Sequence, residues 1–563
     1  MNVNIYQVFT RLFRNDNGSN TYNGSIAQNG SSKFNHFTNE ALHEIKKMGY
    51  THIWFTGVIR HACATAYPED NIQADHPAIV KGKAGSPYAI KDYFDVVPDL
   101  AEHVPNRMQE FESLIERCHQ NELKVIVDFV PNHVCRQYQS ALKPDDIPAL
   151  GQYDDTSMEF SPANNFYYIP GEPFEIPDEI DTEELEPYHE LPAKATGNNV
   201  FRAKPAITDW YETVKLNYGV DFHDGAKEHF DPIPPTWYRM YEVLEFWASK
   251  GVDGFRIDMA EMVPMDFWEW VVPKTRERYH QMLFIAEVYQ PVEYKRFIEQ
   301  AQFDWLYDKE QFYNIVRAVI EGKAPASVIS KIWKEQEGIE KHMLRFLENH
   351  DEQRIASDFF ASDPQKAIPG MVLTATMHKG PVMVYFGQEL GERGMYEEGF
   401  SGCDGKTTIF DYWKVEHYQN WVNKGRFDGA KLDDASVKLR EQYNRLLHLR
   451  KNSQAVIVGD FYDLMWVNDH IDTNNIYTYI RHTEEQVLLV ILNFDHISEK
   501  AFSLNLPIHA AKHVGLDVKE QIQACILYGE HPCSTFHLNQ QNSLSADFKI
   551  GSSSGLIFEL SCI

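Results

Sequence analysis

The chain has 563 residues and a formal net charge of −29, with 82 acidic and 53 basic side chains. Because so acidic a surface repels phosphate groups, nucleic acids and anionic membranes are excluded as partners. No stretch of 18 or more apolar residues is present, so no membrane span is expected. The length predicts about two to four domains, and the 43% share of hydrophobic residues is typical of a soluble globular protein.

The N-terminal segment, MNVNIYQVFTRLF, is too short and too polar to form the apolar core of a signal peptide. We therefore expect a cytoplasmic protein, or a periplasmic or secreted one if a signal has been removed before Met1. The seven cysteines form an odd set without CxxC spacing, which argues against a disulfide framework and against a zinc cluster. No pattern indicates an organic cofactor or a particular oligomeric state.

The first 130 residues alternate strand patterns with helix patterns. Thr38 is suited to cap a helix that Gly49 ends, and a second amphipathic helix lies around residues 111–118. Apolar runs fit for buried strands lie at 3–9, 52–56 and 124–130. Strands that are apolar on both faces and are separated by helices predict a parallel sheet.

The same alternation returns later in the chain. A helix pattern over residues 240–247 is closed near Gly251. Further buried strands are expected at 252–257, 283–286, 344–347 and 382–386. Together with the first three strands, these units predict an α/β fold of the (β/α)₈ type, a closed barrel that typically needs ~250 residues.

Residues 134–210 break this rhythm, because eight prolines fall between Pro144 and Pro192 and no helix or strand period holds. A disordered linker is one interpretation, but aromatic residues such as Phe166 and Phe174 need a place to pack, so we predict an irregular inserted subdomain. From about residue 455, strand-like runs separated by turns predict an antiparallel β-sandwich. The predicted domains are the barrel at 1–133 and 211–454, the insertion at 134–210 and the sandwich at 455–563.

Ionisable residues stand at the C-terminal ends of four expected strands: Asp128, Asp258, Glu287 and Asp351. In such a barrel these strand ends surround one pocket, where catalytic groups lie. Asp258 and Glu287 are 29 residues apart, which is one strand–helix unit, and Asp351 follows 64 residues later, which is two units. Two carboxyl groups in one pocket are what cleavage of a glycosidic bond needs, one as the acid and one facing the oxocarbenium-like carbon.

These segments resemble the four sequence regions of the α-amylase family, glycoside hydrolase family 13. The matching segments, in order, are DFVPNH at 128–133, GFRID at 254–258, AEV at 286–288 and ENHD at 348–351. LNY at 216–218 and GPVMVYFGQE at 380–389 are similar to two further family segments. The resemblance covers residues 1 to about 450 and implies that the barrel acts on α-linked glucans.

The resemblance also implies a role for each residue of the pocket. Asp258 is expected to be the nucleophile, which forms a covalent glycosyl-enzyme, and Glu287 the general acid and then the base. Asp351 is expected to bind sugar hydroxyls and help distort the ring. His133 and His350 are expected to donate hydrogen bonds to hydroxyls of the same sugar.

Three neighbouring residues have expected roles as well. Tyr88, in SPYAIKDYFDV, resembles the tyrosine that stacks beneath the sugar being cleaved. Arg256 lies two residues before Asp258 on the same strand, so its side chain points to the same side and can hold that carboxylate ionised. Asp128 is expected to be structural and to link strand ends through hydrogen bonds.

A calcium ion is a further expectation from the resemblance. Asn132 resembles the family's structural calcium ligand, and the remaining oxygen ligands would come from the inserted segment. After the nucleophile, where many starch-cleaving members carry Lys-His, this chain has Glu261-Met262. This change weakens the calcium expectation, and it favours short oligosaccharides or transfer to a sugar acceptor.

We therefore predict a retaining glycoside hydrolase that cleaves α-1,4-glucosidic bonds in starch-like glucans or maltooligosaccharides. An α-glucosidase or a transglycosylase of the same family is the alternative, and loops around the pocket would decide between them. A third hypothesis is a non-catalytic carbohydrate-binding protein. It is disfavoured because none of Asp258, Glu287 and Asp351 is lost.

Overall fold

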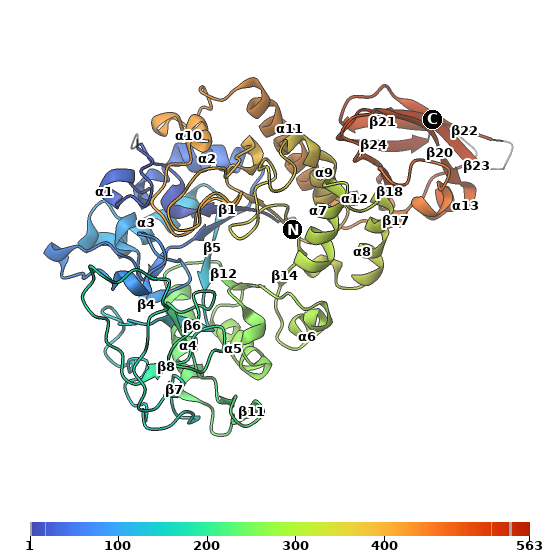
Figure 1. The fold of residues 1–563 in the computed structure, drawn as a ribbon. Coiled ribbons are helices and arrows are strands. Elements are labelled where there is room, and N and C mark those ends of the chain that lie inside the picture. The colour runs from blue at the N-terminus through green and yellow to red at the C-terminus, as the bar shows by residue number, and fades with distance from the viewer. Residues whose placement is uncertain (1–2, 17–18, 519–520, 540–542, 563) are drawn as a thin grey trace.

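The computed structural model describes residues 3–16, 19–518, 521–539 and 543–562. Eight parallel strands form the sheet at the centre of its larger part (Figure 1). In spatial order they are β15 (Met343–Leu344), β14 (Trp305–Tyr307), β13 (Leu283–Ala286), β12 (Gly254–Ile257), β5 (Lys124–Phe129), β2 (His52–Thr56), β1 (Asn4–Phe9) and β16 (Val382–Tyr385). The predicted (β/α)₈ barrel is thereby confirmed.

The sheet closes on itself between β15 and β16, the two ends of this order. Arg345, directly after β15, forms a parallel bridge to Val382. The amide of Met383 donates to the carbonyl of Arg345 at 2.8 Å, and the amide of Arg345 donates to the carbonyl of Pro381 at 3.1 Å. Closure places the C-terminal ends of all the barrel strands on one rim, where the loops carry the functional groups.

Most of the predicted elements are found. The strands predicted at 52–56 and 283–286 have those bounds in the structure, and the strand predicted at 344–347 corresponds to the shorter β15. The barrel strand β14 was not predicted, nor was β4 (Ile90–Val96) outside the barrel sheet. The helix predicted from Thr38 is α2 (Asn39–Lys47), and the Thr38 hydroxyl accepts a hydrogen bond from the amide of Ala41 at 3.3 Å.

The helices lie outside the barrel and side chains fill its interior. These helices include α2, α3 (Arg107–Gln120), α4 (Pro235–Ser249), α5 (Met265–Arg278), α6 (Tyr294–Glu299), α7 (Asn314–Ile320), α8 (Ser330–Glu335), α9 (Ile368–Thr376) and α11 (Asp434–Asn452). Inside the barrel, Trp54, Ile126, Ile285 and Met383 belong to one buried cluster. Because this interior is packed, a ligand binds at the rim of the barrel rather than in a central channel.

Between β5 and β12 the chain forms an irregular excursion beside the barrel, coloured blue-green in Figure 1. Strand β6 (His133–Cys135) pairs with β9 (Thr213–Lys215), and β7 (Tyr168–Ile169) pairs with β8 (Ala193–Lys194), both antiparallel. The aromatic residues Phe166, Tyr167, Tyr168 and Phe174 are buried. This segment therefore packs as an ordered unit, while its predicted limits, like those of the other domains, stay a prediction.

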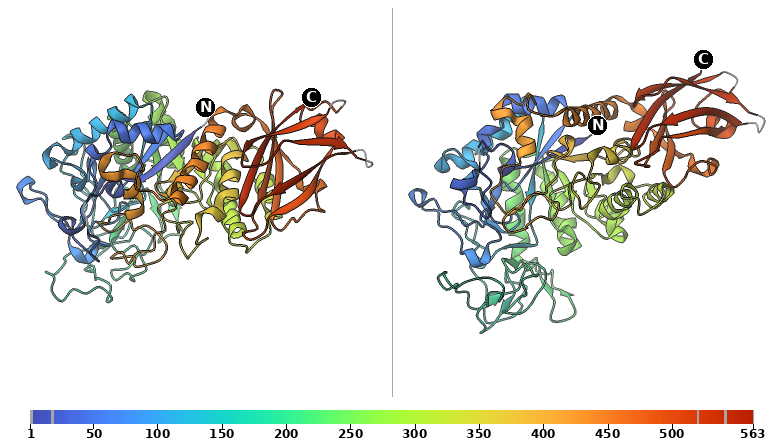
Figure 2. Two further views of the ribbon diagram at one scale, coloured as in Figure 1. Left: turned by 90° about the horizontal axis from the view of Figure 1, so that it is seen from above. Right: turned by 45° about the horizontal axis from the view of Figure 1, so that its top comes forward.

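The C-terminal part is an antiparallel sheet with its own apolar core, as expected. Its strands, in spatial order, are β17 (Asp460–Asp463), β18 (Ile476–His482), β19 (Val487–Asn493), β24 (Ser554–Cys562), β21 (Ile522–Tyr528), β22 (Ser534–Leu538), β23 (Ser543–Ile550) and β20 (Lys500–Pro507). Helix α9 lies against β19 and β24. Figure 2 shows this sheet at one end of an elongated molecule.

Candidate active site

One cavity of about 260 Å³ brings five of the predicted site residues together at the barrel rim. They are Tyr88, His133, Asp258, Glu287 and Asp351. Asp258 follows β12, Glu287 follows β13, and Asp351 lies in the loop beyond β15. Residues far apart in the sequence meet here because parallel barrel strands end on the same rim.

Arg256 lies beneath the cavity and joins its carboxylates. Its Nη1 is 2.9 Å from Oδ1 of Asp258 and 3.5 Å from Oδ1 of Asp128, and its Nη2 is 2.7 Å from Oε2 of Glu287. The Arg256 side chain is fully buried, and its Nε donates to the Tyr307 hydroxyl at 3.2 Å. The predicted contact of Arg256 with Asp258 is present, and the same guanidinium also reaches Glu287.

The buried carboxyl groups of Asp258 and Glu287 influence each other. Burial raises the pKa of Asp258 well above its ordinary value, the Arg256 guanidinium opposes this rise, and the charge of Glu287 adds to it. The Arg256 guanidinium is therefore the group that favours the ionised form of Asp258 against its burial.

Glu287 is fixed by further donors. The amide of Met259 donates to its Oε2 at 3.0 Å, and the Tyr289 hydroxyl donates to its Oε1. Met259 has a φ of 44° and a ψ of 46°, a left-handed backbone conformation that is uncommon for a bulky side chain. In this turn the amide of Met259, which directly follows Asp258, points toward the carboxyl group of Glu287, which directly follows β13.

Asp351 is held ionised by its neighbour. Burial alone would raise the pKa of Asp351, but the charge of His350 and a hydrogen bond from it lower that pKa to about 2, with help from Arg256 and Lys406. Nε2 of His350 lies 3.0 Å from Oδ2 of Asp351, and Nδ1 of His350 lies 2.8 Å from Nε2 of Gln7. His350 thus orients Asp351 from below the cavity rather than lining it.

Tyr88 and His133 both line the cavity. The Tyr88 ring stacks on the imidazole of His350 with centroids 5.2 Å apart, and its hydroxyl lies 2.5 Å from Nε2 of His350. The His133 ring lies 5.2 Å from that of Trp210. Burial, followed by the charges of Lys215 and Lys81, lowers the pKa of His133 to about 3, so its imidazole is neutral near neutral pH.

Asn132 lies outside the cavity and its surroundings do not fit a calcium ion. Its Oδ1 accepts a hydrogen bond from Nζ of Lys215, and its Nδ2 donates to the carbonyl of Gly197 at 2.9 Å. Calcium takes six to eight oxygen ligands, usually including carboxylates. Within the described part of the chain, no group of three or more His, Cys, Asp or Glu side chains is placed to hold a metal ion.

The sequence reasoning missed other residues of the cavity wall, which come mainly from loops: Lys81, Ser86, Trp210, Glu212, Thr213, Met259, Tyr289 and Phe410. Tyr289 could have been found from the sequence, because it lies two residues after Glu287. Trp210, at the end of the insertion, and Glu212, just beyond it, could not, because no helix or strand period holds there. Nζ of Lys81 pairs with Oε1 of Glu212 at 2.8 Å and fixes this part of the wall.

Glu261, which departs from the family pattern, supports the loop that follows Glu287. Its Oε2 accepts hydrogen bonds from the amides of Tyr289 at 3.0 Å and Gln290 at 3.2 Å. It does not belong to the residues that line the cavity. Glu261 therefore acts on the site through the position of Tyr289.

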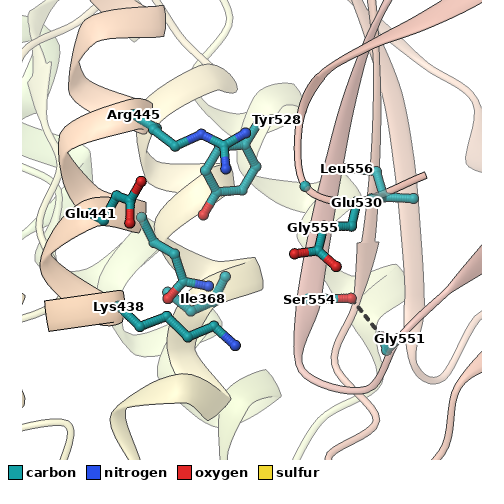
Figure 3. A pocket seen from close by; sticks show the side chains of 12 residues that line it. Ile368, Lys438, Glu441, Arg445, Tyr528, Glu530, Gly551, Ser554, Gly555 and Leu556 are labelled. Atoms are coloured by element: carbon teal, nitrogen blue, oxygen red, sulfur yellow. Dashed lines mark hydrogen bonds between the residues drawn. The ribbon is translucent and has the colours of Figure 1, made fainter. Parts of the chain in front are cut away.

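A second cavity, of about 450 Å³, lies between α11 and the C-terminal sheet (Figure 3). Lys438, Glu441 and Arg445 of α11 face Tyr528 and Glu530, and the Arg445 guanidinium lies 5.3 Å from the centre of the Tyr528 ring. The cavity contains none of the predicted site residues, and its charges have both signs. It marks the joint between the two parts of the molecule.

Among the described residues, no helix combines the length and the apolar character that crossing a membrane requires.

Comparison with known proteins agrees with this fold. The family model "Alpha amylase, catalytic domain" matches residues 7–459. Alpha-amylase 3 of Dictyoglomus thermophilum is 24% identical over 442 residues, which cover 74% of this chain and 76% of that protein. A cyclomaltodextrinase of a Bacillus species is 22% identical over 424 residues, which cover 74% of this chain and 61% of that protein.

Solved structures of similar proteins align over nearly the whole chain. An alpha-amylase from Geobacillus thermoleovorans, complexed with acarbose, aligns with a TM-score of 0.64 and 16% identity over 99% of this chain and 98% of that one. A noncanonic maltogenic alpha-amylase from Thermotoga neapolitana aligns with a TM-score of 0.61 and 18% identity over 100% and 99%. These structures show the fold, and the family model spans most of the sequence. The chain belongs to the alpha-amylase family, glycoside hydrolase family 13, and is a glycoside hydrolase.

Proposed function

We propose that this protein is a retaining hydrolase of α-1,4-glucosidic bonds in starch-like glucans or maltooligosaccharides. The observation that carries the proposal is the contact of one buried guanidinium, Arg256, with both Asp258 and Glu287 at the wall of one cavity. Relatives named as alpha-amylases, a cyclomaltodextrinase and a maltosyltransferase support an α-glucan as the substrate.

In the first step, a carboxylate oxygen of Asp258 attacks the anomeric carbon. The bond from that carbon to the leaving oxygen breaks, and Glu287 gives its proton to the leaving oxygen. The guanidinium of Arg256, 2.9 Å from Oδ1 of Asp258, stabilises the carboxylate form that this attack requires. The product is a covalent glycosyl-enzyme on Asp258.

In the second step, Glu287 takes a proton from water while the water oxygen attacks the anomeric carbon, and Asp258 leaves as a carboxylate. Retention follows because the anomeric carbon is inverted twice. Asp351, ionised beside His350, accepts hydrogen bonds from sugar hydroxyls, and the Tyr88 ring lies against the sugar. If a sugar hydroxyl replaces water in this step, the same site performs transglycosylation.

The size of the cavity favours short substrates as a second candidate. At about 260 Å³ it is smaller than most sites for small molecules, which span ~300–1,000 Å³. The ion pair of Lys81 with Glu212, together with Trp210, forms part of its wall. An α-glucosidase or a transglycosylase acting on short oligosaccharides is therefore the alternative.

The test is a time course of products from soluble starch and from maltoheptaose, resolved by chain length and by anomer with NMR. Wild type is compared with Glu287→Gln and with Glu299→Gln, a matched change at an exposed residue of α6. Short α-anomeric maltooligosaccharides that are absent only with Glu287→Gln support the hydrolase. Glucose alone, or products longer than the substrate, support the alternative, and β-anomers first would refute retention.

An α-glucosyl fluoride separates the two carboxyl roles. Fluoride leaves without a proton, so Glu287→Gln should still release it, whereas Asp258→Asn should not. If both variants fail equally on the fluoride while they remain folded, the assignment of Glu287 as the acid is wrong.

A further inference from the structure

Lys215 is a buried cation on β9, just after the inserted segment. It ends β9 and is only 3% exposed. Its Nζ donates to Oδ1 of Asn132 and to the carbonyl oxygen of Met262, the latter at 3.2 Å. Met262 lies four residues after Asp258, so this contact reaches the loop that follows the proposed nucleophile.

The orientation of the Asn132 side-chain amide determines which of its atoms faces Lys215. Nδ2 of Asn132 donates to the carbonyl of Gly197, at 2.9 Å, and lies 3.0 Å from Nδ1 of His133. The opposite atom, Oδ1, is thereby turned toward Lys215. Four segments meet at this point: the end of β5, the middle of the insertion, β9 and the loop after β12.

The chemistry around Nζ suits an amine and not a divalent ion. The two oxygens it contacts are neutral, an amide and a carbonyl, and the ring of Phe222 lies 5.8 Å from Nζ. A calcium ion at Asn132 would have to displace Nζ and would gain neither carboxylates nor six oxygens.

We infer that Nζ of Lys215 takes the place of a structural metal ion in this chain, linking the end of β5 and the inserted segment to the loop behind Asp258. Folding of the barrel with its insertion then requires no calcium. This inference concerns the structural support of the site, so its tests do not depend on the proposed reaction.

The first test measures the response of the wild-type protein to calcium. Its thermal unfolding midpoint should be the same in excess Ca²⁺ and in excess EDTA, and calorimetric titration of the EDTA-treated protein with Ca²⁺ should show no stoichiometric uptake. A midpoint that falls in EDTA, together with one bound Ca²⁺ that Asn132→Ala removes, would overturn the inference.

The second test changes the amine. Lys215→Met keeps the length of the side chain but leaves two buried oxygens without a donor, so the unfolding midpoint should fall by several degrees in Ca²⁺ and in EDTA alike. Lys194→Met is the matched control, because Lys194 ends the neighbouring strand β8 and its side chain is 21% exposed. An effect of Lys215→Met no larger than that of Lys194→Met would refute the role of Lys215.

The third test restores a metal ligand. Lys215→Asp places a carboxylate beside Asn132 and the Met262 carbonyl, so Ca²⁺ should raise the unfolding midpoint of this variant above its value in EDTA. Lys215→Met, which lacks the carboxylate, should show no such rise. Equal responses of the two variants would contradict the idea that Nζ occupies a cation position. If Lys215→Asp does not fold, the first two tests still decide.

Discussion

The hydroxyl of Tyr289 donates a hydrogen bond to Oε1 of Glu287, two residues earlier in the chain. The other oxygen of Glu287 accepts from the amide of Met259 and lies against Arg256. Two hydrogen-bond donors and one cation thus fix the carboxyl group that is proposed to exchange protons with the substrate. Arg256 and Met259 come from β12 and the turn after it, and Tyr289 comes from the loop after β13. Glu261 in turn accepts a hydrogen bond from the amide of Tyr289. The loop after β13 therefore helps to position Glu287.

Tyr289→Phe removes one donor to Glu287 and keeps the ring. We expect kcat/KM on maltoheptaose to fall by about tenfold, the equivalent of one hydrogen bond of ~1.4 kcal/mol. The unfolding midpoint should change little, because Tyr289 is only half-buried. Initial rates with purified wild type and variant check this. An unchanged kcat/KM would show that the bond does not position Glu287 in the transition state.

Arg256→Met should both inactivate and destabilise the protein. The change leaves three buried carboxyl groups, Asp128, Asp258 and Glu287, without their shared cation. We expect the free energy of unfolding at pH 7 to fall by about 3–5 kcal/mol, measured by urea denaturation. Arg256→Lys keeps the positive charge but lacks the two terminal nitrogens of the guanidinium, and it should lose less stability. Wild-type stability of Arg256→Met would contradict the described ion pairs.

Trp210→Ala should weaken substrate binding more than chemistry. Trp210 lines the cavity beside His133 and touches none of the carboxyl groups through a hydrogen bond. Loss of its ring should raise KM for maltooligosaccharides by about tenfold, the equivalent of ~1.4 kcal/mol, while kcat changes little. Trp210→Phe should restore most of the affinity. A fall in kcat with KM unchanged would instead assign Trp210 to the positioning of the reacting groups.

Three buried histidines predict a loss of stability in mild acid. Burial is the main cause that lowers the pKa of His52, His61 and His133 from 6.5 to about 3. Between these values the unfolded chain binds a proton that the folded chain does not, so stability falls as the pH drops below 6.5. At pH 5 each of them should cost about 2 kcal/mol.

His61→Gln isolates one of these contributions outside the proposed site. The free energy of unfolding is measured in urea at pH 7 and at pH 5. Its decrease from pH 7 to pH 5 should be about 2 kcal/mol smaller for the variant than for wild type. His76→Gln, at a partly exposed histidine, is the comparison and should fall as wild type does. Equal falls for wild type and His61→Gln would mean that His61 is protonated in the folded protein.

The sequence by itself determined the barrel and placed Asp258 and Glu287 at the ends of its strands. Strand and helix patterns are local, and Asp258 and Glu287 directly follow strands whose apolar runs can be read from a few neighbours. Since parallel strands in a closed barrel end on one rim, local strand positions were enough to predict that these residues meet. The barrel strand β14 was not predicted from the sequence.

Only the tertiary structure decided the wall of the cavity and the surroundings of Asn132. Lys215 lies 83 positions from Asn132, and Trp210 and Glu212 come from a segment without helix or strand period. Where such a segment folds depends on long-range packing and on buried polar groups that must find partners, and no spacing in the sequence encodes these contacts. The meeting of the strand-end carboxyl groups at the barrel rim could thus be predicted from the sequence, whereas the shape of the cavity could not.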